Sequence, residues 1–101
     1  MAFEMYAGEL RGEVASHEER IFVEISSRAQ DYPELSKIWT QFYSSPKLLP
    51  EQSERIVHEL IDFMSDPIHS TDSDIQRVVL RLLPFFSKAY RLNTIVRCAS
   101  D

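Results

Sequence analysis

The sequence predicts an all-α fold, an asymmetric four-helix bundle with long first and last helices. Apolar residues recur in four segments at the three- and four-residue spacing of amphipathic helices. Prolines stand where helices should begin rather than inside apolar stripes. No segment alternates between apolar and polar residues for long enough to indicate a strand. We therefore expect one domain, 1–101, with helices at about 3–29, 33–44, 50–65 and 71–93.

The first predicted helix has two distinct faces. One repeats at alternating intervals of four and three residues, like a coiled-coil seam: Phe3, Ala7, Leu10, Val14, His17 and Ile21. The opposite face carries mostly small residues, which would let a second backbone approach closely. Its candidate interface residues are Met5, Gly8, Gly12 and Ala15. The alternative is that the two glycines only weaken the helix, by about 1 kcal/mol each.

The second and third predicted helices each gather their apolar residues on one side. The second collects Leu35, Ile38, Trp39, Phe42 and Tyr43. The third collects Ile56, Val57, Leu60, Ile61, Phe63 and Met64. This arrangement would leave the charged residues of the third helix, including Glu54, Glu59 and Asp62, exposed to water.

The fourth predicted helix opposes an apolar face to a basic stripe. The apolar face comprises Ile75, Val78, Val79, Leu82, Phe86 and Ala89, and the stripe comprises Arg77, Arg81, Lys88 and Arg91. Pro84 projects onto the basic side. Because proline removes a helical hydrogen bond, we expect this helix to be bent or broken near Pro84.

Acidic residues are concentrated in the segment 51–74, which has seven acids and Arg55 as its one base, on a chain of net charge −5. Such a surface disfavours nucleic acid and would attract a basic protein. The candidate partner-binding residues are Glu51, Glu54, Glu59, Asp62 and Asp66. Part of the pattern has a simpler origin, since acids near helix starts complement the helix dipole.

One segment of the third predicted helix suggests a metal site. The run from His58 to Asp62 resembles the zinc-protease pattern H-E-x-x-H with aspartate in place of the second histidine, so His58, Glu59 and Asp62 are candidate residues of a metal-dependent hydrolase. Only His17 and His69 remain as histidine third ligands. No cofactor is expected. The loops that bind the phosphates of nucleotide cofactors are rich in glycine, and no glycine follows Gly12 in this sequence.

The favoured function is a non-enzymatic protein–protein interaction module, a small acidic inhibitor or immunity-type protein that occludes a basic partner. This assignment rests on analogy with small acidic helical proteins of that kind. The alternative is a structural or assembly protein, or a secretion chaperone, that self-associates through the first helix. We expect a cytoplasmic protein that does not enter membranes, because no apolar run approaches 18 residues, the N-terminus is unlike a signal peptide, and Cys98 is the sole cysteine.

Overall fold

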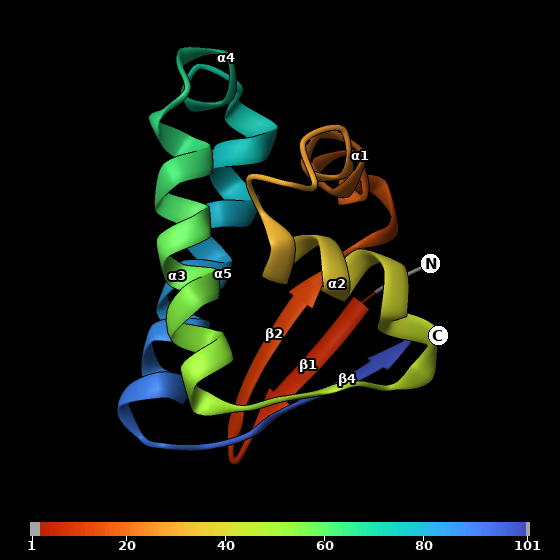
Figure 1. Cartoon of the computed structure of the whole chain (residues 1–101), viewed down its shortest axis with the longest axis vertical. Helices are drawn as coiled ribbons and strands as arrows, with labels where there is room; N and C mark the ends of the chain where they lie inside the picture. Colours follow the sequence, from red (N-terminus) through yellow and green to blue (C-terminus); the bar gives the residue numbers. More distant parts are fainter. Residues whose placement is uncertain (1–2, 101) are drawn as a thin grey trace.

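A four-stranded antiparallel sheet, with helices packed on one face, forms the centre of the fold, so the all-α prediction is wrong (Figure 1). This computed structural model describes residues 3–100, apart from the side chains of Tyr43 and Ser100. Residues 1–2 and 101 of the predicted domain lie outside that part. The protein therefore combines helices and sheet and is not a helical bundle.

The sheet has the strand order β2-β1-β4-β3. Its strands are β1 (Phe3–Ala7), β2 (Leu10–Val14), β3 (Lys47–Leu48) and β4 (Val96–Ser100). The α-helices are α1 (Arg20–Ser26), α2 (Pro33–Gln41), α3 (Pro50–Ser65), α4 (Pro67–Ser70) and α5 (Ser73–Arg91). Two short 3₁₀ helices are η1 (Ser16–Glu18) and η2 (Phe42–Ser44). The two ends of the described chain thus meet in neighbouring central strands, with Phe3 opposite Ser100.

The segment predicted as one long helix, 3–29, instead forms the β1–β2 hairpin, η1 and α1. Gly8 has a φ of 60° at the first of two loop positions, as a type II′ hairpin turn requires. Phe3 and Ala7 lie on one face of β1, and residues four apart also share a face of a helix. The five-residue strands were therefore mistaken for helical turns.

The remaining helix predictions fare better. The third predicted helix, 50–65, is confirmed by α3, and α2 with η2 covers 33–44. The fourth is close to α5 in its bounds, and of the two predicted alternatives, a bend or a break near Pro84, the break is wrong because α5 continues through Pro84. Pro84 and the residue four before it, Leu80, are both exposed, so water can satisfy the carbonyl that loses its partner.

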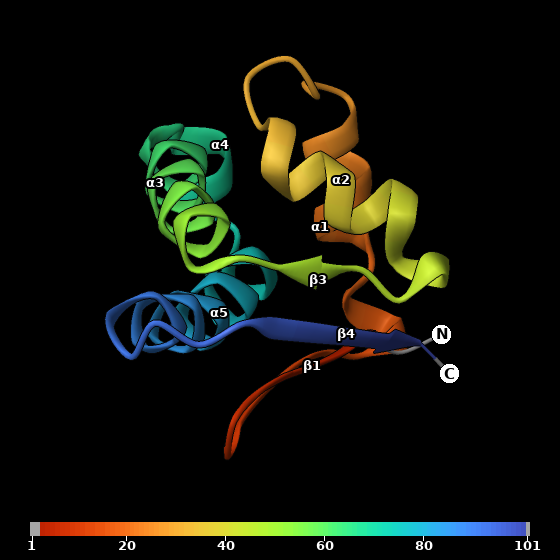
Figure 2. The same cartoon turned by 60° about the horizontal axis from the view of Figure 1, so that its bottom comes forward.

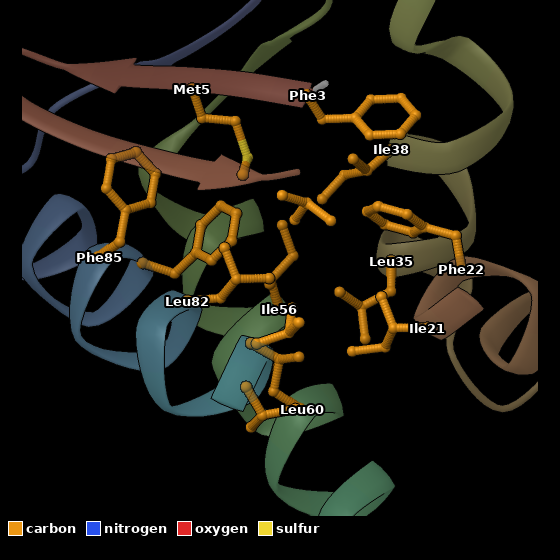
Figure 3. Packing of buried hydrophobic residues seen from close by; sticks show 14 of the residues in the cluster. Phe3, Met5, Ile21, Phe22, Leu35, Ile38, Ile56, Leu60, Leu82 and Phe85 are labelled. Carbon is orange, nitrogen blue, oxygen red and sulfur yellow. The ribbon is translucent and has the colours of Figure 1, made fainter. Parts of the chain in front are cut away.

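The core fills the space between the inner face of the sheet and two helix pairs, α1 with α2 and α3 with α5. Figure 3 shows side chains from the sheet and all four helices meeting there: Phe3, Met5, Ile21, Phe22, Leu35, Ile38, Ile56, Leu60, Leu82 and Phe85. The ring of Phe3 meets that of Phe42 edge-on at 4.3 Å between centroids. Trp39 is half-buried and stacks on Phe22.

Candidate protein-binding surface

Three of the five predicted partner-binding acids lie along the outer side of α3. Glu51 and Asp62 are exposed, and neither forms an ion pair with any residue in the described range. Glu54 is half-buried, and its carboxylate, close to the hydroxyl of Tyr90 in α5, raises the pKa of Tyr90. This side of α3 therefore presents negative charge that the fold leaves largely unneutralised.

The helix α3 runs beside α5 (Figure 1), and both helices carry exposed apolar side chains. The proximity of Tyr90 to Glu54 indicates which flanks of the two helices face each other. Helical spacing puts Ile61 on the same flank of α3 as Glu54, whereas Leu80, ten residues before Tyr90, lies about 80° around α5 from Tyr90, on the side away from the core. Ile61 is 52% exposed and Leu80 is 69% exposed. We call the area formed by Glu51, Glu54, Ile61, Asp62 and Leu80 the α3–α5 surface.

Glu59, the fourth predicted acid, is buried rather than exposed. Its carboxylate accepts hydrogen bonds from the backbone amides of Glu34, at 3.1 Å to each oxygen, and of Leu35, at 3.0 Å. These amides belong to the first turn of α2, and the residue at its N-cap, Tyr32, makes no side-chain cap. Burial raises the pKa of Glu59, although the amide hydrogen bonds oppose the shift. Glu59 therefore serves the fold and is not part of the surface.

Asp66, the fifth predicted acid, caps α4. One carboxylate oxygen accepts from the backbone amide of Ile68 at 3.0 Å, and the other lies 3.4 Å from a guanidinium nitrogen of Arg28. The first contact is local to the turn after α3, and the second joins that turn to the segment after α1. Asp66 thus has a structural role at the end of the acidic helix.

The predicted metal residues do not converge. His58 and Asp62 are exposed on α3, whereas the carboxylate of Glu59 is directed towards α2. His69 is buried, with Nδ1 2.8 Å from the carbonyl oxygen of Phe63. Among residues 3–100, no group of three or more His, Cys, Asp or Glu side chains is placed to hold a metal ion. The geometry gives the hydrolase hypothesis no site.

The predicted interface residues of the first helix also lie apart, because that helix does not exist. Met5 is buried in the core, and Gly8 is in the hairpin turn. Gly12 faces the ring of Phe85, and Ala15 is the half-buried N-cap of η1. The small-residue face was a product of helical projection, and these four residues do not form one helical face in the structure.

The basic stripe of α5 is directed towards the hairpin, on the flank opposite α3. Both terminal nitrogens of Arg81 donate to the carboxylate of Glu18, at 2.5 and 2.9 Å, and one also donates to the carbonyl of Glu13 at 3.1 Å. Hydrogen bonds from Arg81 lower the pKa of Glu18. Arg81 thereby ties α5 to η1 and β2, which separates it from the acids of α3.

The apolar part of the α3–α5 surface does not follow from the sequence prediction. That prediction buries Ile61 in the apolar face of its helix and gives Leu80 no role. Leu80 did carry a signal, because it falls outside the apolar stripe of α5 at helical spacing. A large apolar residue off the core stripe is a candidate contact residue.

None of the helices in residues 3–100 is both long and apolar enough to cross a bilayer. The sequence matches no protein-family model, and comparisons with curated proteins and with solved structures give no significant match.

Proposed function

We propose that this protein is a non-enzymatic binding module that docks a basic protein partner on its α3–α5 surface, as a small acidic inhibitor or immunity-type protein would. The observation that carries the proposal is that α3 and α5, which pack together, both carry exposed apolar side chains, Ile61 and Leu80, while α3 also carries the unpaired carboxylates of Glu51 and Asp62. Protein interfaces combine such parts, an apolar centre and a polar rim.

The two kinds of side chain would contribute differently to binding. Burying Ile61 and Leu80 against a partner would remove apolar area from water and so favour the complex. The acids, on a chain of net charge −5, would attract a basic surface over about 10 Å at moderate salt. Charge would therefore set the association rate, and apolar contact would hold the complex together.

The proposal places the protein in the cytoplasm. Cys98 is a buried thiol whose pKa burial raises to about 12, so it is an unreactive side chain that needs no disulfide partner. A lone thiol of this kind fits a reducing compartment.

The proposal is tested by photo-crosslinking in the native cell. A benzophenone amino acid is introduced at Leu80 and, as the matched control, at Gln30, which is exposed between α1 and α2. We expect a basic protein to be crosslinked from position 80 and not from position 30. Absence of a specific product at position 80, or the same products at both positions, would contradict the proposed surface.

The same crosslink then tests the role of charge. Glu51→Lys with Asp62→Lys should abolish the product from position 80. Glu9→Lys with Asp74→Lys changes the net charge equally at exposed positions outside the α3–α5 surface and should leave the product in place. Equal loss in both double variants would mean that net charge, rather than the α3–α5 surface, drives the contact.

A further inference from the structure

A row of cationic side chains crosses the outer face of the sheet. Tyr6 is paired with Arg11 of β2 on one side and with Arg97 of β4 on the other, and Arg97 is paired with Lys47 of β3. Directly opposed residues of neighbouring strands project from the same face of a sheet. Along each strand, side chains alternate between the two faces, and the neighbours Met5 and Cys98 are buried. The row therefore lies on the face directed away from the core, which is the lower side of β1 and β4 in Figure 2.

The two ends of this row differ in how their charges are balanced. Arg11 lies 2.7 Å from Glu4 and 3.0 Å from Glu13, so two carboxylates surround it. Lys47 and Arg97 are exposed, and within the described residues neither forms an ion pair. Like charges directly opposite each other destabilise a sheet. The Lys47–Arg97 pair is therefore a local conflict that an anion would resolve.

A hollow in the surface adjoins this pair. It has a volume of about 410 Å³ and is lined by Tyr6, Ser45, Lys47, Arg97, Cys98 and Ala99. Ala99 stands two residues from Arg97 on the same face, and its small side chain leaves room between neighbouring strands. Ser45, a lining residue with a hydroxyl, has a φ of 49°, a left-handed conformation that glycine adopts more easily. The hollow thus combines two cations with a hydrogen-bonding group.

We propose that this hollow binds a phosphate group, free or as the monoester of a small molecule. A phosphate dianion balances both Lys47 and Arg97, whereas a carboxylate balances only one of them. The guanidinium of Arg97 can donate two parallel hydrogen bonds to phosphate oxygens, and the ammonium of Lys47 acts as a point charge. This site is separate from the α3–α5 surface, and the proposal that it binds phosphate does not depend on the proposed function.

The experiment is a titration of the ¹⁵N-labelled protein with inorganic phosphate and with phenyl phosphate, followed by NMR at constant ionic strength. We expect saturable shifts of the amides of Ser45, Lys47 and Arg97 with a dissociation constant of about 1 mM. Tighter binding of phenyl phosphate would identify an ester as the ligand, with its ring beside Tyr6. Equal binding of both probes would identify the free anion.

Two variants make the test specific. Arg97→Gln should weaken phosphate binding about tenfold or more, because it removes a charge-assisted contact. Arg91→Gln removes another exposed arginine, at the end of α5, and should change binding by less than about twofold. Lys47→Gln repeats the test at the second cation in case Arg97→Gln does not fold. The proposal is overturned if the shifts fail to saturate, if singly charged benzoate reproduces them with equal affinity, or if Arg91→Gln weakens binding as much as Arg97→Gln.

Discussion

The carboxylate of Glu59 in α3 holds the backbone amide of Glu34 in α2, with both oxygens 3.1 Å from the nitrogen. The relationship is reciprocal, because the side chain of Glu34 lies 3.3 Å from Arg55 and 3.3 Å from Gln52, both in α3. Each helix thus contributes a buried glutamate to the other. This exchange joins α2 to α3 and leaves Glu51 and Asp62, on the outer side of α3, exposed.

Replacing Glu59 should destabilise the protein. Glu59→Ala removes the cap of α2 and leaves its first amides without an acceptor, so we expect the free energy of unfolding to fall by about 1–3 kcal/mol. Glu59→Gln keeps an acceptor oxygen and should cost less. Asp62→Ala, at an exposed position of the same helix, should change stability by under about 0.5 kcal/mol. Urea denaturation measures all three, and equal effects of Glu59→Ala and Asp62→Ala would show that the cap contributes nothing.

The Glu18–Arg81 contact should make stability depend on pH. Hydrogen bonds from Arg81 lower the pKa of Glu18 from its usual 4.5 in the folded protein. The stabilisation is therefore fully present above the unfolded value and is lost as the pH falls through the lowered folded value. Glu18→Gln should destabilise the protein by about 1–2 kcal/mol at neutral pH, and the difference from wild type should shrink at strongly acidic pH. Urea titrations at both pH values check this; a difference that does not change with pH would be inconsistent with the pair.

Gly12 should tolerate no side chain while Phe85 is present. A Cβ atom at position 12 would lie 3.0 Å from a carbon of the Phe85 ring, closer than ordinary packing allows. Gly12→Ala should therefore cost about 1–3 kcal/mol of stability, through displacement of the ring.

A double-mutant cycle separates this contact from backbone effects. Combining Gly12→Ala with Phe85→Leu should cost less than the sum of the two single changes, because the smaller side chain makes room. Gly8→Ala is the control, since its cost arises from a φ of 60° in the hairpin turn rather than from Phe85. Additive effects of Gly12→Ala and Phe85→Leu would argue against the contact.

Ser53 in α3 should be replaceable by alanine without loss of stability. Its side chain is fully buried, and its hydroxyl has no hydrogen-bond partner within the described residues. Ser53→Ala removes this unsatisfied group and should leave the free energy of unfolding unchanged or raise it by up to about 1 kcal/mol. Thermal unfolding of the two proteins decides the matter, and a decrease of more than about 1 kcal/mol would mean that the hydroxyl has a favourable contact.

The long helices could be predicted from the sequence because their signal is local. Pro50 begins α3 where expected. The apolar stripe of α5 spans many turns, so it indicates one helix even though Pro84 lies within it. The sheet could not be predicted in this way. Its central pairing joins Phe3 to Ser100 at opposite ends of the described chain, and β3 has only two residues, too few to show a period.

Part of the candidate site, the exposed acids of α3, could also be predicted because its signal is local. Helical periodicity placed Glu51 and Asp62 on the outer side of α3, where the structure also has them. Periodicity cannot show which flank of a helix another helix covers. The position of α2 buries Glu59, and the flank shared with α5 leaves Ile61 half-exposed. These two assignments depend on tertiary packing, which the pattern of a single helix does not contain.

The most direct test of the account is the association rate of the crosslinked partner, once purified, with wild-type protein and with the Glu51→Lys, Asp62→Lys variant. If the acids of the α3–α5 surface attract a basic partner, the wild-type rate should fall as salt is added, and the double reversal should lower it by about tenfold or more at low salt. The Glu9→Lys, Asp74→Lys control should retain most of the wild-type rate. A rate that responds neither to salt nor to the reversal of Glu51 and Asp62 would contradict the account.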